Sequence, residues 1–307
     1  MSAASTGVAG PGVVVVVGSV NADLVVALER IPRAGETLTA SGLERRQGGK
    51  GGNQAAAAAR LGGDVRFVGR VGDDAEGAAA RAALEDDGVD CAALLPTAGE
   101  PTGTALVLLE GDGENAIAVV PGANARLSPD DVAGALAPLP GEHVVVLACL
   151  EVPVETVHAA ARAARQRGWG FVLNPAPAQP LPAELLALVD VLTPNEHELG
   201  LLSPGGAPAL LEAGVGAVVV TRGAAGADVV TAQGQEHHDA YAVAGGPVDT
   251  TGAGDAFSGT LAWALAAQRP LGDAVEQACA AGALATRAVG ARAALATAAE
   301  VESVLRR

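Results

Sequence analysis

Aromatic residues make up only 2% of this chain, so its hydrophobic core has to be built from small aliphatic side chains. Apolar residues are 50% of the 307, which is enough for a substantial core in one large domain. The cysteines are few, odd in number and widely spaced, at Cys91, Cys149 and Cys279. This pattern excludes a disulfide framework and a cysteine-based metal site, and it favours a reducing cytoplasm.

Positive charge is also scarce: the chain has 19 basic and 35 acidic residues, which gives a formal net charge of −16. A surface this acidic repels phosphate backbones, so the sequence predicts no nucleic-acid partner. The N-terminal residues 1–12 carry no basic side chain, and the apolar run Val13–Val17 is too short for a signal segment or a membrane span. We therefore expect a soluble protein without membrane attachment, in which any phosphorylated ligand is held by a local positive feature.

Lysine is reduced to a single residue, Lys50, against 18 arginines among the 19 basic residues. It lies in the most glycine-rich run of the chain, Gly48–Asn53. A compact ammonium group cannot be replaced by a planar guanidinium, so this lone exception indicates a functional role.

The order of apolar segments predicts a three-layer α/β/α fold with a doubly wound, mostly parallel sheet. The β-branched run Val13–Val17 is typical of a strand buried on both faces. Further strands are expected at Val65–Val68, Val144–Leu147, Gly170–Leu173, Val191–Leu192, Val215–Val220 and Asp228–Val230. Helices are expected at Gln54–Leu61, Ala75–Leu84, Val154–Arg167, Glu184–Val189, Gly254–Ala267 and Ala274–Ala288.

Two pairs of short alternating segments predict a small second sheet. The first pair is Leu24–Leu28 with Glu36–Ala40, and the second is Thr104–Leu109 with Asn115–Val120, joined by the turn sequence at 111–113. We expect these strands, within about 22–43 and 101–122, to form a β-lid over a cleft. The whole chain, 1–307, is interpreted as one domain with this appendage.

The strongest chemical motif is Asp249–Gly259, Asp-Thr-Thr-Gly-Ala-Gly-Asp-Ala-Phe-Ser-Gly. Its glycines, Gly252 and Gly254, allow the backbone amides around Ala253 to point to one spot at the start of a helix. Such a nest of amides suits the charge that develops on a transferring phosphoryl group. Asp255 stands beside it and can accept a proton from an attacking hydroxyl. An isolated Gly-Asp pair of this kind is usually only a helix cap.

Polar residues that suit a polyhydroxylated ligand occur near the ends of early strands. Asn21 and Asp23 follow the first strand, Asn53 ends the glycine-rich run, and Glu151 follows the strand near residue 147. These strand ends meet at one edge of an open sheet, where ligands bind. Taken singly, each is more often an ordinary turn residue.

Two further segments indicate a bound nucleotide. Asn195 and Glu198 share one helix face and could organise Mg²⁺ on phosphates, although the same pattern is equally typical of a helix cap. The turn Thr221–Gly226 follows a buried strand and could lie under an adenine or ribose.

Together these motifs resemble the ribokinase branch of the PfkB-type carbohydrate kinases, in order over nearly the whole chain. The matching segments are Gly18–Asp23, Pro32–Thr37, Gly48–Gln54, Val71–Asp74, Pro121–Asn124, Asn174–Ala178, Thr193–Glu196 and Asp249–Phe257.

The resemblance implies roles for individual residues. Those that would hold the sugar are Asn21, Asp23, Gly49, Lys50, Asn53 and Glu151, with Asp255 as the catalytic base. Those that would border ATP and its Mg²⁺ are Asn195, Glu198, Thr221, Gly223, Gly226, Gly254 and Cys279. A monovalent cation, usually K⁺, would lie near Asp249, Thr251, Ala285, Ala288, Gly290 and Ala294. The resemblance also implies a homodimer formed through the β-lid.

The chain departs from the family pattern at two of these places. Gly290–Ala294 reads Gly-Ala-Arg-Ala-Ala, without the usual Pro-Ser, which removes one oxygen from the cation site and predicts weaker activation by K⁺. Cys279 stands where an Asn or His usually lies near the adenine, so the nucleotide contact differs there.

The expected function is ATP-dependent phosphorylation of D-ribose at the 5-hydroxyl, giving D-ribose 5-phosphate and ADP. Kinases of the same fold acting on deoxyribose, fructose or adenosine are alternatives, although few aromatic residues are available in the lid to stack on a nucleoside. A non-catalytic sugar sensor is disfavoured by the intact Asp255, and an NAD-type oxidoreductase by the missing glycine fingerprint after the first strand.

Overall fold

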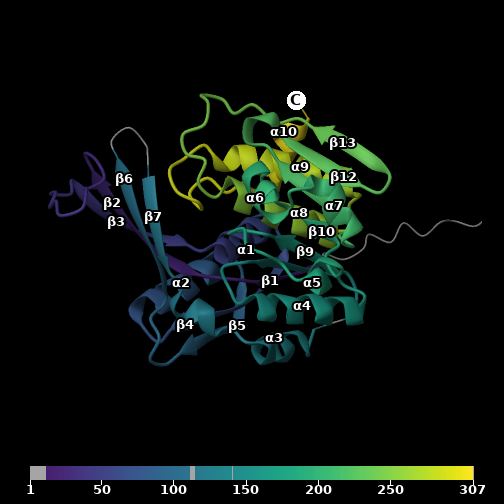
Figure 1. Cartoon of the computed structure of the whole chain (residues 1–307), viewed down its shortest axis with the longest axis horizontal. Helices are drawn as coiled ribbons and strands as arrows, with labels where there is room; N and C mark the ends of the chain where they lie inside the picture. The colour runs from purple at the N-terminus through teal and green to yellow at the C-terminus, as the bar shows by residue number, and fades with distance from the viewer. Residues whose placement is uncertain (1–11, 111–114, 140, 307) are drawn as a thin grey trace, which may run out of the picture.

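The computed structural model describes residues 12–110, 115–139 and 141–306, which form two sheets of unequal size (Figure 1). The larger sheet has nine strands, and all neighbours are parallel except the β11–β12 and β12–β13 pairs. In spatial order the strands are β13 (Gly234–His238), β12 (Ala227–Thr231), β11 (Ala217–Thr221), β10 (Val191–Leu192), β9 (Gly170–Asn174), β8 (Val144–Cys149), β1 (Val13–Val17), β4 (Asp64–Gly72) and β5 (Asp90–Thr97).

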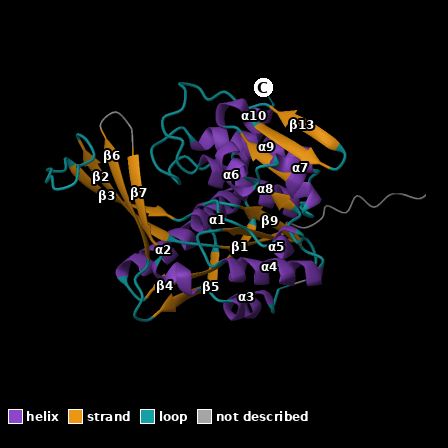
Figure 2. Cartoon of the chain, viewed as in Figure 1, coloured by secondary structure: helices purple, strands orange, loops and turns teal. Residues whose placement is uncertain are grey.

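Helices cover both faces of this sheet, so the predicted three-layer architecture is confirmed (Figure 2). The valines of β1 alternate between two cores: Val14 and Val16 pack with α1, α8 and α9, while Val13, Val15 and Val17 pack with α3 and α4. The helices of the described chain are α1 (Lys50–Arg60), α2 (Ala75–Asp86), α3 (Pro129–Leu136), α4 (Val154–Arg167), α5 (Ala183–Leu186), α6 (Glu196–Leu202), α7 (Gly206–Glu212), α8 (Ala253–Ala266), α9 (Leu271–Ala285) and α10 (Ala298–Leu305).

The second sheet has the order β3 (Gly42–Gly48), β2 (Asn21–Leu28), β6 (Gly103–Glu110) and β7 (Asn115–Val120), and it stands at the left of Figure 1. The hairpin of β6 and β7 is confirmed, while the turn predicted at 111–113 lies outside the described residues. The β2 and β6 strands run parallel, so the sheet is mixed rather than made of two stacked hairpins.

The strand predicted at Glu36–Ala40 is wrong, because the partner of β2 is β3. The carboxylate of Glu36 accepts hydrogen bonds from the Arg33 amide at 2.9 Å and from Arg30 at 2.5 Å. These contacts close residues 30–36 into a loop, and Gly35 adopts a positive φ of 84° within it. Residues 36–40 are therefore part of a loop in spite of their alternating pattern, and the chain joins the small sheet only after Ser41.

Helices α1 and α8 approach very closely, which brings their first turns together. A Cβ on Gly259 would lie 2.3 Å from the carbonyl oxygen of Gln54 and 3.0 Å from Ala57, so only glycine permits this crossing. The alanine-rich composition of both helices keeps the rest of the contact equally close. As a result, Gln54 on α1 faces Asp255 on α8.

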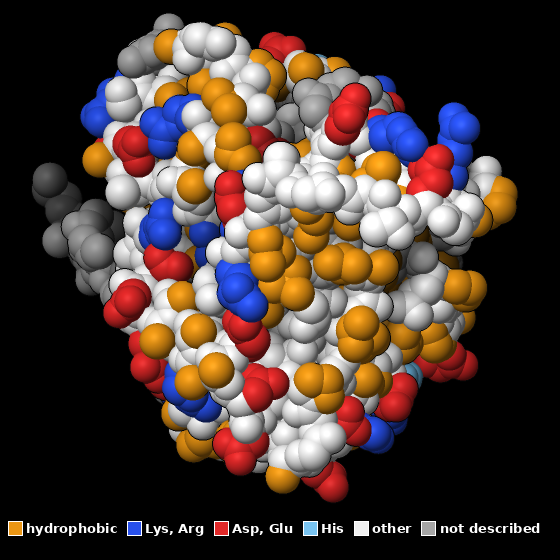
Figure 3. Space-filling model, turned by 90° about the vertical axis from the view of Figure 1, so that its left-hand side faces the viewer, with side chains coloured by type: hydrophobic (Ala, Val, Ile, Leu, Met, Phe, Trp, Pro, Cys, Tyr) orange, Lys and Arg blue, Asp and Glu red, His pale blue; other side chains and the backbone are white. Residues whose placement is uncertain are grey.

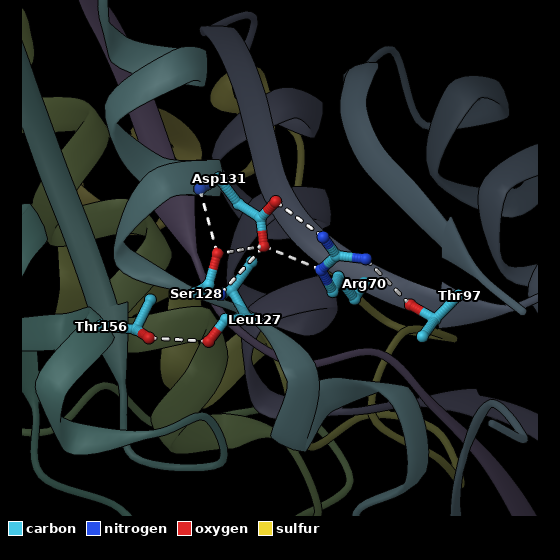
Figure 4. Close-up of polar contacts among 6 residues, drawn as sticks. All are labelled: Arg70, Thr97, Leu127, Ser128, Asp131 and Thr156. Atoms are coloured by element: carbon cyan, nitrogen blue, oxygen red, sulfur yellow. Dashed lines mark hydrogen bonds and ion pairs between the residues drawn. The ribbon is translucent and has the colours of Figure 1, made fainter.

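A polar network ties β4 to α3 and β5 (Figure 4). The guanidinium of Arg70 donates twice to Asp131, with both distances 2.7 Å, and once to Thr97 at 3.3 Å. Asp131 also completes a capping box with Ser128 at the start of α3. In the first turn of α4, Thr156 donates to the carbonyl oxygen of Leu127, just before α3, at 2.7 Å. No helix in the described ranges is long and apolar enough to cross a bilayer.

Replacing Asp131 by Asn should lower the free energy of unfolding by about 1.5–3 kcal/mol near neutral pH, because a charged bidentate acceptor is lost. Its hydrogen bonds to Arg70 and Ser128 hold the pKa of Asp131 below its usual value against the effect of burial. A lowered folded-state pKa means that this stabilisation is present above the unfolded-state pKa of about 3.9 and disappears as the pH falls below it.

Chemical denaturation of wild type and variant across this pH range measures the difference. Asp130→Asn is the matched control, because Asp130 is exposed in the same helical turn and should change stability by less than about 0.5 kcal/mol. A gap between wild type and Asp131→Asn that stays constant from neutral pH to below pH ~3.9 would contradict this assignment.

Candidate active site

The carboxylate of Asp255 lies at the third position of α8 and is only 7% exposed. Two side-chain amides orient it: Asn53 Nδ2 donates to Oδ2 at 2.9 Å, and Gln54 Nε2 donates to Oδ1 at 3.1 Å. Gln54 Nε2 also donates to Asn174 Oδ1 at 3.1 Å, which fixes the amide from the other side. The carboxylate therefore has a defined direction and remains an acceptor with spare lone pairs for a substrate hydroxyl.

The turn before α8 has the geometry of an anion hole. Gly252 adopts φ 78°, the left-handed conformation that the motif predicts, and caps the helix. The amide of Ala253 donates to the Thr250 carbonyl at 3.2 Å, whereas among the described residues the amides of Gly252 and Gly254 have no acceptor. A Cβ on Gly254 would meet nothing within 4 Å, so this position faces open space. Both amides lie at the N-terminus of α8, where backbone amides and the helix dipole favour an anionic ligand.

Lys50 is the first residue of α1 and lies beside two carboxylates. Its backbone amide donates to Glu151 Oε2 at 3.0 Å, and the same oxygen accepts the hydroxyl of Ser19. The charge of Asp255 raises the pKa of Lys50, with a further contribution from Glu151, and together they outweigh the opposing effect of burial. Lys50, the single lysine of the chain, is therefore a stable cation close to Asp255 and Glu151.

Asn21 and Asp23 enter the site from the first half of β2. Asn21 is 3% exposed, and its Oδ1 accepts a hydrogen bond from Asn124 Nδ2 at 2.8 Å. Asn124 is itself fixed by hydrogen bonds with both backbone groups of Val20. Burial, followed by the charge of Glu151, raises the pKa of Asp23 to about 6. Asn21 and Asp23 therefore provide a partly desolvated polar surface suited to sugar hydroxyls.

A cavity of about 560 Å³ lies on the other side of the α8 N-terminus. Its lining includes five of the residues predicted to border a nucleotide: Thr221, Gly223, Gly226, Gly254 and Cys279. The aromatic rings of Tyr241 and Phe257 also line it, in a chain with one tyrosine and three phenylalanines. Gly254 borders the cavity and Asp255 is the next residue of α8, so the cavity lies beside the turn of helix that carries the Asp255 carboxylate.

A family model described as pfkB family carbohydrate kinase matches residues 13–298. The chain belongs to this family. Bacillus subtilis (strain 168) ribokinase is 37% identical to this PfkB kinase over 294 residues, covering 94% of the chain and 98% of the relative. Salmonella typhi deoxyribokinase is 35% identical over 260 residues, covering 81% and 84%. The structure of Arabidopsis thaliana ribokinase complexed with ribose and ATP matches with a TM-score of 0.88 at 33% identity, covering 97% and 100%.

In the PfkB kinase, Asn195 and Glu198 form a reciprocal capping box at the start of α6. Asn195 Oδ1 accepts the Glu198 amide, Glu198 Oε2 accepts the Asn195 amide, and both distances are 2.8 Å. The helix-cap interpretation of this motif is therefore confirmed, and these residues lie outside the lining of the cavity. The charge of Glu198 nevertheless contributes to the raised pKa of Lys50. Its second carboxylate oxygen remains available to a metal-bound water.

Three of the predicted cation residues, Asp249, Thr251 and Gly290, contact one another just before α8. Asp249 accepts the amide of Thr251 on one oxygen and that of Gly290 on the other, each at 2.8 Å. These contacts hold the pKa of Asp249 below its usual value. Ala294 is buried and supplies no side-chain oxygen. The remaining donors, a carboxylate and backbone carbonyls near Ala285, Ala288 and Gly290, are of the type that a hard monovalent cation accepts.

The glycine-rich run forms the start of α1, which begins at Lys50 and not at Gln54 as the sequence predicts. Gly49 has φ 83° and caps α1, so Lys50–Asn53 already belong to the helix. A Cβ on Gly51 would lie 2.6 Å from the Ser19 amide nitrogen. These glycines thus allow the first turn of α1 to pack against the protein's own backbone, which places Lys50 and Asn53 in the site.

The sequence patterns missed three residues that support the site. Gln54 and Asn124 lie inside quoted motif segments, but no role is evident until their contacts are seen. Arg292 has no counterpart in any motif, although it lies within the segment Gly290–Ala294 that departs from the family pattern. Its side chain is 9% exposed and contacts Asn53 directly.

Proposed function

We propose that this PfkB family kinase transfers the γ-phosphoryl group of ATP to the 5-hydroxyl of D-ribose. The observation that supports this most directly is the buried Asp255 carboxylate, oriented by Asn53 and Gln54 between a polar pocket and a nucleotide-sized cavity. The similarity to ribokinases over nearly the full length supports ribose as the acceptor.

In this reaction the oxygen of the sugar's primary hydroxyl attacks the γ-phosphorus. The bond from that phosphorus to the β–γ bridging oxygen breaks, ADP leaves, and the hydroxyl proton passes to Asp255. The amides of Gly252 and Gly254 stabilise the charge that develops on the transferring group. Lys50 keeps a positive charge near the reacting oxygen and the base. Asn21, Asp23 and Glu151 hold the remaining hydroxyls.

Two cations fit the residues present. Mg²⁺ is usually held by substrate phosphates with few protein ligands, and Glu198 is the carboxylate placed to orient its water shell. Among the described residues, no three His, Cys, Asp or Glu side chains form a cluster that could hold a metal ion. A monovalent cation beside Asp249 would add positive charge behind the anion hole. Since Ala294 contributes no oxygen, we expect weaker dependence on K⁺ than a complete ligand set would give.

The decisive experiment couples ADP release to a spectroscopic readout, with ribose, deoxyribose, fructose and adenosine as acceptors, in K⁺ or Na⁺ buffer. We expect ribose to give the highest kcat/KM, at least about tenfold above the others, and exchange of K⁺ for Na⁺ to have only a modest effect. A higher kcat/KM for deoxyribose would instead assign the chain to deoxyribose, the acceptor named for the Salmonella relative. ADP release without any acceptor dependence would overturn the proposal.

We also propose that two copies associate through the small sheet. The strand register puts the side chains of Asp23 and Leu106 on opposite faces of this sheet, and we take the face of Asp23 as the inner one. The outer face exposes Leu43, Leu106 and Val120, and hydrophobic side chains gather on this side of the molecule in Figure 3. Such a patch is typical of an interface between subunits. Sedimentation equilibrium, which reports mass directly, would refute this if the protein were a monomer at micromolar concentration.

We expect the reaction to occur in the cytoplasm, where the free buried thiols stay reduced.

A further inference from the structure

Arg292 inserts a guanidinium group beneath the first turn of α1, directly behind the catalytic carboxylate. Its Nε donates to Asn53 Oδ1 at 3.0 Å, and its Nη2 donates to the Gly48 carbonyl at 3.3 Å. The backbone of Arg292 is held as well, because Arg60 Nη1 donates to the Arg292 carbonyl oxygen at 2.9 Å. The side chain is 9% exposed, so this contact is sheltered from solvent.

The place for this guanidinium exists because residue 52 is glycine. A Cβ on Gly52 would lie 2.3 Å from Arg292 Nη2, while its next backbone neighbour, the Ser19 carbonyl oxygen, would be 3.7 Å away. The backbone of Gly52 does not have a positive φ, so an alanine here would clash only with the Arg292 side chain, which would have to move away from Asn53. Gly52 and Arg292 are thus one steric unit formed by residues far apart in the chain.

The contact determines which way the Asn53 side-chain amide points. An arginine can only donate, so the oxygen of the amide must face Arg292 and the NH₂ group must face Asp255. That orientation is the one in which Asn53 Nδ2 donates to Asp255 Oδ2 at 2.9 Å. Without a donor behind it, the amide could rotate and turn its oxygen towards the carboxylate, which would repel the base.

We propose that Arg292 is a positioning residue, which together with Gly52 fixes the Asn53 amide so that Asp255 is held in its reactive orientation. This inference rests on the proposed phosphotransfer for its kinetic consequence, but the steric unit itself does not depend on the substrate. Arg292 acts through Asn53 and has no assigned contact with the sugar or the nucleotide.

A double-mutant cycle tests the unit. Arg292→Ala should lower kcat by about tenfold or more, because the base loses its fixed geometry. Gly52→Ala should lower kcat at least as much in the wild type, since its methyl group displaces the guanidinium. In the Arg292→Ala background the same Gly52→Ala change should alter kcat by less than about twofold, because the space is then free.

Gly51→Ala is the matched control for the cycle. Its Cβ meets backbone atoms of Ser19 and Gly18, so its damage should be the same with or without Arg292. Arg167→Ala controls for the loss of an arginine that donates to a backbone carbonyl, here Leu136 at 2.7 Å, at the far end of α4. It should leave kcat within about twofold of the wild type.

Two conservative variants separate orientation from packing. Lysine is also a pure donor, so Arg292→Lys should retain a kcat several-fold above that of Arg292→Gln, whose amide can accept as well as donate. The dissociation constant for ribose should change less than kcat in both. If Arg292→Ala does not fold, Arg292→Met, similar in length but without donors, replaces it in the cycle. Equal kcat for the Lys and Gln variants, or equal damage by Gly52→Ala in both backgrounds, would overturn the proposal.

Thermal unfolding separates this proposal from the proposed function. If ribose is not phosphorylated, the reaction assignment fails, but Gly52→Ala should still lower the Tm in the wild type and leave it almost unchanged in the Arg292→Ala background. A Tm loss that is the same in both backgrounds would refute the steric unit, whatever the substrate.

Discussion

Asp255→Asn should abolish most turnover while ribose still binds. We expect kcat to fall by about 10²- to 10⁴-fold, the usual contribution of a general base. The asparagine matches the aspartate in shape but cannot take the hydroxyl proton. Its NH₂ group would also face one of two donors, Asn53 Nδ2 or Gln54 Nε2, and neither can reverse easily because Arg292 and Asn174 hold their other sides. We therefore expect a parallel loss of about 1–2 kcal/mol in the free energy of unfolding.

Single-turnover kinetics and calorimetric ribose binding measure the two effects separately. Asp190→Asn is the matched control. Asp190 also accepts a hydrogen bond from an amide, here the backbone amide of Phe171, but it lies just before β10, at the amino ends of the parallel strands. That variant should keep kcat within about twofold of the wild type. If Asp255→Asn turned over at near-normal rate, the base would have to be a different residue.

Gly252→Ala should be the second most damaging change. The residue adopts φ 78°, and its new Cβ would lie 2.6 Å from the Cβ and 2.7 Å from the Cα of Ala291. The turn must therefore open, which moves the free amides away from the transferring phosphoryl group. Loss of one such donor costs about 10²- to 10³-fold in kcat. The measurement is steady-state kcat with saturating ribose and ATP, together with a denaturation curve.

Gly62→Ala isolates the effect of the backbone conformation. Gly62 has φ 86°, but its Cβ would meet nothing within 4 Å and it follows α1 away from the site. This variant should lose about 1–2 kcal/mol of stability and keep its kcat. If Gly252→Ala behaved in the same way, with stability reduced and kcat retained, the anion-hole assignment would be wrong.

Much of the fold was predictable because its signals are local. The run Val13–Val17 has to be buried on both faces, and the pattern from Asp249 to Phe257 carries its own turn and helix start. By contrast, β5 was not predicted, since Asp90–Thr97 has few β-branched residues and ends in Pro-Thr. It becomes a strand only by pairing with β4 at the sheet's edge, which no local pattern reports.

The candidate site shows the same division. Asp255, Lys50 and Glu151 follow strands or glycine turns and were predicted from those positions. Arg292 contacts Asn53 from 239 residues away, and such a contact leaves no trace in spacing or periodicity. Asn195 and Glu198 show a different difficulty. Their local pattern is visible in the sequence, but it fits both a helix cap and a metal-associated motif, so the pattern alone does not decide between them.

The junction between β3 and α1 consists of Gly49 alone. On one side of it, Gly48 ends a strand of the small sheet and lies against Asp23; on the other, Lys50 begins the helix that orients the base. Since a single residue joins the two elements, we expect a tilt of the sheet to be transmitted to the first turn of α1. We therefore expect that a movement of the small sheet over a bound sugar would also move the helical turn that orients Asp255.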